Sequence, residues 1–105
     1  MRCILILTTV PSKKDGQKIA GRLLRGKAAA CVTISSPVES HYWWRKKIEK
    51  SKEWMLFIKT QKRLYGKAEK IILKAHPYDV PEIISLPVGK VSSKYLSWIK
   101  NSTGL

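Results

Sequence analysis

Acidic residues are scarce in this sequence of 105 residues, where only 7 Asp and Glu stand against 21 Lys and Arg. The formal net charge is therefore +14. A balance this basic raises the expectation of an anionic partner, although it carries no information about the fold.

Cysteines and long apolar segments are also few. The two cysteines, Cys3 and Cys31, lack the Cys-x-x-Cys spacing, which favours free thiols in a reducing compartment over a disulfide framework. No apolar run approaches the roughly 20 residues that a membrane helix needs. We therefore expect a cytoplasmic protein without a membrane span.

Common catalytic patterns are missing as well. The sequence has no Ser-His-Asp arrangement, no paired carboxylates and no glycine-rich loop that would bind phosphate. We therefore do not predict an enzyme, and we expect no cofactor to be required for folding.

The residues that are present suit one small globular domain over residues 1–105. Hydrophobic residues make up 44% of the chain, which is ordinary for a globular protein and too high for a disordered one. A chain of this length can bury a single modest core.

Hydrophobic periodicity and turn residues divide the chain into strands and helices. Ser12 and Asp15 form a capping signal for a first helix, and Pro37 should interrupt the second strand. The expected elements are strand 3–9, a helix from Ser12 to Gly26, strand 28–34 continued at 39–44, strand 53–59, a helix capped by Thr60 and ended by His76-Pro77, strand 82–88, and a short helix opened by Ser92 that buries Tyr95, Leu96 and Ile99.

This order, strand-helix-strand-strand-helix-strand, is the signature of the ferredoxin-like α+β fold. Both strand-helix-strand crossovers should be right-handed, which places both helices on one face of the sheet. The second and third strands form a long hairpin.

The hairpin within residues 41–60 is apolar on both faces. Side chains alternate along a strand, so Trp43 and Trp44 cannot share a face, and neither can Trp54 and Phe57. One small chain supplies helices for only one face. Two such aromatic rings left in water would forgo several kcal/mol per chain. We therefore infer a closed homo-oligomer with these four residues in its interface.

Several short motifs, spread over nearly the whole chain, occur in a characteristic order. They are Thr8-Thr9-x-Pro11, Ala29-Ala30-Cys31-Val32, Tyr42-Trp43-Trp44, Lys47-Ile48-Glu49, Glu53, Ile58-Lys59-Thr60, His76-Pro77-Tyr78-Asp79-Val80-Pro81-Glu82-Ile83 and Tyr95-Leu96-Ser97-Trp98. This set resembles the CutA family of divalent-cation tolerance proteins. The resemblance implies a ferredoxin-like protomer assembled as a tight homotrimer, and a link to copper and other divalent cations. In animal members it also implies anchoring of a membrane esterase.

The chain departs from the family at three places. The hairpin turn reads Trp44-Arg45-Lys46-Lys47, where members commonly have Trp-Glu-Gly-Lys. Members proposed to bind copper carry a cysteine at the position of Thr8 and a second histidine at the position of Ala75. His76 alone remains of that set.

Two residues are candidate metal ligands. His76 can ligate a metal through a neutral ring nitrogen. The alternative is a protonated histidine that caps the last carbonyls of the preceding helix. Cys31 is a candidate soft ligand for copper, and the alternative is a buried structural thiol. His41 is expected at the surface or in an interface.

A candidate pocket combines Tyr42, Trp44, Lys59, His76 and Tyr78, where the hairpin would meet the His-Pro-Tyr segment. An aromatic wall with one lysine and one histidine would suit a small anion or a metal complex. In the alternative, the aromatics pack between subunits and Lys59 pairs with Glu53 or Glu82.

The basic residues follow a pattern that predicts weak, salt-sensitive nucleic-acid binding. The alternative is a solvated surface. The groups are Lys14, Lys18, Arg22 and Arg25 on one helix stripe, Arg63, Lys67, Lys70 and Lys74 on another, and Arg45, Lys46, Lys47, Lys50 and Lys52 around the hairpin turn.

Two other functional classes remain open. RNA-recognition motifs share the element order, but here the first strand lacks their stacking aromatics. A small-ligand regulatory trimer would share the shape and use the pocket.

Overall fold

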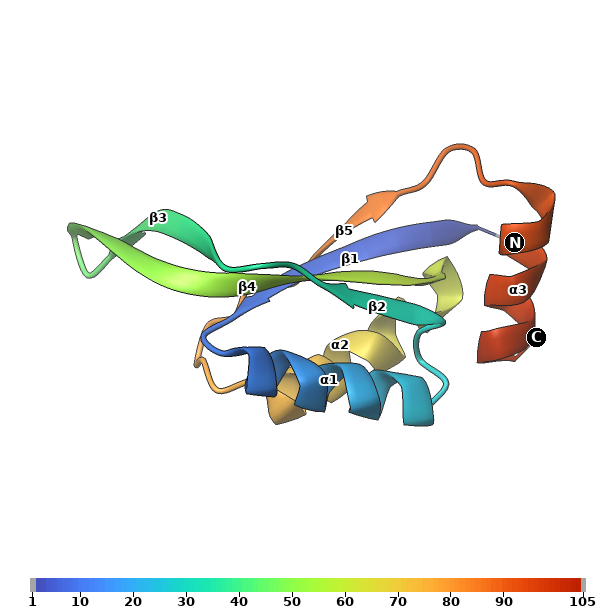
Figure 1. Cartoon of the computed structure of the whole chain (residues 1–105), viewed down its shortest axis with the longest axis horizontal. Helices are drawn as coiled ribbons and strands as arrows, with labels where there is room; N and C mark the ends of the chain where they lie inside the picture. The colour runs from blue at the N-terminus through green and yellow to red at the C-terminus, as the bar shows by residue number, and fades with distance from the viewer. Residues whose placement is uncertain (1, 105) are drawn as a thin grey trace.

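The computed structural model describes residues 2–104 and confirms an α+β fold with an antiparallel sheet. Figure 1 shows the sheet with two helices beneath it and a third at one end. In chain order the elements are β1 (Cys3–Val10), α1 (Lys13–Arg25), β2 (Cys31–Ile34), β3 (Val38–Trp44), β4 (Lys47–Gln61), a 3-10 turn (Lys62–Leu64), α2 (Tyr65–Ala75), β5 (Ile84–Pro87) and α3 (Ser93–Thr103).

The sheet has the order β2-β4-β1-β5, and β3 pairs with the first half of β4. The strand predicted at 53–59 extends further at both ends in the structure, because β4 also forms the second arm of the hairpin. Pro37 separates β2 from β3, as the sequence predicts. The strands predicted at 28–34 and 82–88 are shorter in the structure, where they span Cys31–Ile34 and Ile84–Pro87.

The hydrophobic core lies between the sheet and the two helices α1 and α2. Ile6, Leu56 and Ile58 from the sheet are fully buried there, together with Ile19 of α1 and Ile72 of α2. Both helices therefore cover the same face, as predicted (Figure 1). The opposite side of the sheet is covered by neither α1 nor α2 and is called the helix-free face below; only α3 reaches one end of it, at Cys3.

Two of the three predicted helix caps are confirmed. The backbone N–H of Asp15 donates to Ser12 Oγ over 3.1 Å, and the N–H of Tyr95 donates to Ser92 Oγ over 3.4 Å. The prediction for Thr60 is wrong. Thr60 is buried in β4, where its hydroxyl donates to the carbonyl of Ala28 over 2.7 Å. The strand therefore continues through it, and α2 begins only at Tyr65.

Helix α3 buries Ile99 and Thr103. The prediction that it also buries Tyr95 is wrong, since that ring is exposed, and Leu96 is only half-buried. Ile99 packs with Cys3 and Ala30 at one end of the sheet. Within residues 2–104, no helix is both long and apolar enough to cross a bilayer.

The β3–β4 hairpin extends away from the rest of the protein (Figure 1). The molecule as a whole, hairpin included, measures 45 × 26 × 23 Å along its principal axes. Every residue from 41 to 50 is exposed. The two central turn residues, Arg45 and Lys46, have positive φ values of 48° and 68°. Positive φ at both positions is typical of type I′ turns, which strongly prefer Asn-Gly or similar pairs. This turn therefore holds two unfavourable backbone conformations.

Replacing Lys46 by glycine should relieve one of them. We expect Lys46→Gly to raise the free energy of unfolding by about 0.5–1 kcal/mol, since glycine adopts positive φ without a Cβ clash. Urea denaturation at fixed protein concentration measures the change. Lys46→Ala removes the same charge but keeps the clash, so an equal gain in that control would contradict the backbone explanation.

Candidate functional site

Directly opposite residues on neighbouring strands share a face of the sheet, and on the helix-free face they form two rows. The first row is Leu86, Leu5, Lys59 and Cys31, and the second is Ile84, Leu7, Phe57 and Thr33. Ile84 and Leu86 of β5 are about half exposed. This face is therefore apolar and partly uncovered.

Lys59 forms a small polar cluster on that face. Its ammonium donates to the hydroxyl of Thr33 and lies 3.7 Å from Cys31 Sγ. Tyr95 of α3 also lies beside Cys31. Partial burial of its phenol, together with that neighbour, raises the pKa of this tyrosine. Cys31 is half-buried, so the prediction of a fully buried thiol is wrong for it, whereas Cys3 is buried.

His76 makes a second cluster at the base of the hairpin. The backbone N–H of Tyr78 donates to His76 Nδ1 over 3.1 Å, so Nδ1 carries no proton. The ring's Nε2–H therefore donates to the carbonyl of Thr9 over 2.8 Å. Burial is the main cause that lowers the pKa of this imidazole. His76 is thus neutral, and both its nitrogens are occupied within the chain.

The helix α2 ends at His76, as predicted. The alternative in which the side chain of His76 caps the last carbonyls of that helix is wrong. Its ring bonds to the end of β1 rather than to the last carbonyls of α2. A proton on Nδ1 would face the donating N–H of Tyr78, so the protonated form expected at a helix C-terminus is disfavoured.

A buried carboxyl group completes this second cluster. Glu53 is only 6% exposed and accepts a hydrogen bond of 2.7 Å from the Tyr78 hydroxyl. Burial and this bond raise the pKa of Tyr78, and the phenol of Tyr42 lies close enough to add to the effect. The pKa of Glu82 is raised by burial and then by the charge of Glu53. The alternative pairing of Lys59 with Glu53 or Glu82 is not observed.

Within one chain, the predicted five-residue pocket is divided. His76 and Tyr78 are in contact, with ring centroids 4.9 Å apart, and Tyr42 is near them. Lys59 instead belongs to the cluster with Cys31 on the helix-free face. Trp44 lies at the hairpin turn, beside Arg45.

The predicted interface residues also fall into two groups. Trp43 and Trp44 are 71% and 47% exposed and free to contact another chain. Trp54 packs partly against its own core, and the Lys52 ammonium lies 5.4 Å from its ring centroid. Phe57 is half-buried on the helix-free face.

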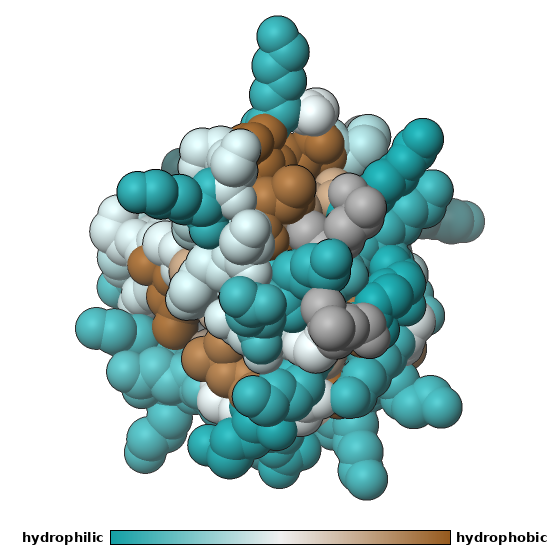
Figure 2. Space-filling model, turned by 90° about the vertical axis from the view of Figure 1, so that its right-hand side faces the viewer, coloured by the Kyte–Doolittle hydropathy of each residue, from teal (hydrophilic) through white to brown (hydrophobic). Residues whose placement is uncertain are grey.

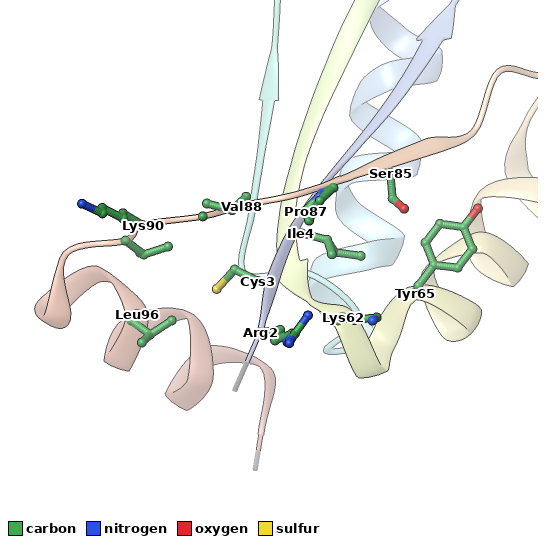
Figure 3. Close-up of a pocket in the computed structure, with 12 residues that line it drawn as sticks. Arg2, Cys3, Ile4, Lys62, Tyr65, Ser85, Pro87, Val88, Lys90 and Leu96 are labelled. Carbon is green, nitrogen blue, oxygen red and sulfur yellow. The ribbon is translucent and has the colours of Figure 1, made fainter.

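Sequence reasoning missed a cavity of about 1010 Å³ between the start of β1, the end of β5 and α3. Figure 3 shows the basic side chains of Arg2, Lys62 and Lys90 at its border, with the apolar Ile4 and Leu96 along its walls. These residues come from four separate segments of the chain. No local motif could have grouped them.

The described residues do not place three or more His, Cys, Asp or Glu side chains together as a metal-binding group. The two candidate ligands lie apart, because Cys31 is on the helix-free face and His76 is at the end of α2. Thr8 and Ala75, which stand where the resemblance implies a cysteine and a second histidine, are both buried on the helix side. Cys31 thus lies on the other side of the sheet from Thr8 and Ala75. One chain therefore cannot bring these positions together around one metal ion.

Comparison with known proteins identifies the family. Residues 4–102 match the CutA1 divalent ion tolerance protein family. The chain belongs to this family. CutA 1 of rice, named a chloroplastic protein, is 43% identical over 95% of this chain, which spans only 56% of the rice protein. The divalent-cation tolerance protein CutA of Thermus thermophilus is 35% identical, covering 95% of this chain and 97% of that protein.

Solved CutA1 structures have the same fold. The crystal structure of rice CutA1 superposes with a TM-score of 0.96 at 41% identity, covering 99% of this chain and 95% of that one. CutA1 of Ehrlichia chaffeensis gives a TM-score of 0.93 at 33% identity, covering 98% and 96%. An archaeal relative from Archaeoglobus fulgidus is described as periplasmic.

The neutral state of His76 predicts an acid-dependent loss of stability. An unfolded imidazole takes up a proton near its ordinary pKa of 6.5, whereas the folded one does so only at lower pH. Below pH 6.5 the unfolded state therefore binds more protons, and the free energy of unfolding falls as the pH falls. Removing this titration with His76→Gln should flatten the pH dependence of the urea midpoint between about pH 7 and pH 5.

His41→Gln is the matched control, since it removes the other histidine from an exposed position beside Glu39. The slope should persist in this control. An unchanged slope in His76→Gln would show that another group controls acid stability.

Proposed function

We propose that the chain acts in divalent-cation tolerance as a non-catalytic homotrimer that binds copper or another divalent metal ion. Membership of the CutA1 family supports the role, as do the names of relatives such as the Thermus protein. The strand order, with both helices on one face, supports a ferredoxin-like protomer.

The exposed hairpin is the observation that carries the assembly. Trp43 pairs with Ile48 across the two arms, so the two side chains form one apolar surface, and both are about 70% exposed. Trp44 is exposed on the other face. At about 25 cal/mol per Å² of apolar surface, burying these side chains would contribute several kcal/mol per chain. A second copy of the chain can supply that cover.

The helix-free face offers a second surface for assembly. Ile84 and Leu86 lie beside Leu7 and Leu5 there, and the chain's own helices do not cover them. A closed ring of three chains, each placing its hairpin against a neighbour, would bury both surfaces at once. It could also bring Trp44 of one chain toward another chain's Lys59 or His76, which would rebuild the divided pocket.

Cys31 is the better of the two metal candidates. Its thiol is half-buried rather than enclosed, and a thiolate is a strong ligand for copper and zinc. His76 would have to give up a hydrogen bond to Thr9 or Tyr78 before either nitrogen could ligate. Because one chain does not assemble three ligands, we propose that further ligands come from neighbouring chains or from the metal's solvent shell. Free thiols of this kind favour a reducing compartment such as the cytoplasm.

Assembly can be tested by light scattering on a sizing column. Three copies of the 12.0 kDa chain should give about 36 kDa at micromolar concentration. Trp43→Glu places a charge in the proposed interface and should shift the mass toward a single chain. Leu73→Glu changes an exposed leucine on α2, away from the hairpin, and should leave the mass unchanged. A wild-type mass of one chain would rule the trimer out.

Metal binding can be tested by competition against a chromophoric chelator with copper(I) and zinc(II). We expect Cys31→Ser to weaken binding by about tenfold or more, because the thiolate is the strongest ligand offered. Cys3→Ser removes the buried thiol and serves as the control, and His76→Gln tests the other candidate. Equal affinity in Cys31→Ser and wild type would remove Cys31 from the site.

A further inference from the structure

The outer surfaces of α1 and α2 carry eight exposed basic residues, here called the basic helix face. They are Lys13, Lys14, Lys18, Arg22 and Arg25 of α1 and Lys67, Lys70 and Lys74 of α2. The two acidic residues of these helices, Asp15 and Glu69, are half-buried and bonded to Ser12 and Tyr65. Hydrophilic side chains accordingly project from the lower part of the molecule in Figure 2, where Figure 1 places the two helices.

These charges are not compensated within the described chain. Among residues 2–104, both salt-bridge contacts are made by Glu39 of the hairpin, one with the Lys50 ammonium and one with the imidazole of His41. Basic residues four positions apart, such as Lys14 with Lys18 and Lys70 with Lys74, repel each other and destabilise the helix that carries them. The repulsion between these side chains does not stabilise the isolated chain. Their uncompensated positive charge can instead bind an anion.

The spacing of the charges matches an extended polyanion. Lys14, Lys18, Arg22 and Arg25 recur every three or four residues, which corresponds to steps of about 4.5–6 Å along the helix axis. Lys67, Lys70 and Lys74 form a second row on α2, and the two helices pack side by side. Neighbouring helix axes lie about 8–10 Å apart. Two parallel rows of cations can therefore contact several phosphates of one duplex.

We propose that the basic helix face binds the phosphate backbone of double-stranded nucleic acid without reading its sequence. α1 has no aromatic residue, and the one of α2, Tyr65, is half-buried with its hydroxyl bonded to Glu69, so these helices offer no platform for stacking single-stranded bases. Their apolar residues face the core, apart from Leu24 and Leu73. The helices therefore cannot lie in a bilayer interface as amphipathic membrane helices do. The proposal depends on neither the trimer nor the metal site.

Fluorescence anisotropy with labelled duplexes of about 20 base pairs, one DNA and one RNA, tests this proposal. We expect binding at about 50 mM salt that weakens steeply by 200 mM, as for a protein that neutralises several phosphates. Lys18→Glu/Lys70→Glu should weaken binding at least tenfold. Lys94→Glu/Lys100→Glu is the matched control, because it reverses the same number of exposed lysines on α3 and should change the affinity much less.

Three results would overturn the proposal. The first is no binding of either duplex at low salt, and the second is an equal loss in both double variants, which would indicate diffuse attraction by net charge. The third is tighter binding to vesicles containing anionic phosphatidylglycerol than to either duplex, which would assign the surface to a membrane. Circular dichroism checks the fold of each variant. Lys18→Gln/Lys70→Gln, which does not reverse the charge, replaces the glutamate pair if that pair unfolds.

Discussion

The backbone pairing of β4 is the constraint on which the rest of the structure depends. This 15-residue strand pairs with β1 along its second half, with β2 on the other side of that half, and with β3 along its first half. Its alternation places Leu56 and Ile58 in the core, and Phe57 and Lys59 on the helix-free face. Because register fixes the face of every side chain, a shift by one residue would expose the core and bury Lys59.

The length of β4 also explains why the protein has two distinct surfaces. Its second half is covered by α1 and α2, whereas its first half extends beyond them with β3. The exposed Trp43 and Trp44 lie on this uncovered part, and the basic helix face lies on the covering helices. Assembly through the hairpin and binding of a polyanion would therefore not compete for the same surface.

Local chemistry made much of this fold predictable from the sequence. Several of its features depend only on residues that are close together in the sequence. They are the helix caps at Ser12 and Ser92, the break at Pro37 and the pairing of the two hairpin arms. Thr60 was mispredicted because its hydroxyl bonds to Ala28, which is 32 residues away. The role of His76 likewise depends on Thr9, which is 67 residues away. Patterns in the sequence single out Thr60 and His76. They do not show which residues far away in the chain will form hydrogen bonds with them.

The outer edge of β5 gives the positive charge a further consequence. β5 pairs with β1 on one side, and in the part of the chain described no strand pairs with its other side. An open strand edge and an exposed tryptophan are the features that let newly made chains associate in the wrong register. Mutual repulsion between molecules of net charge +14 reaches only about 8 Å in physiological salt. We therefore expect the lysine and arginine charges to slow chance collisions between chains, while contacts that bury large complementary surfaces can still form.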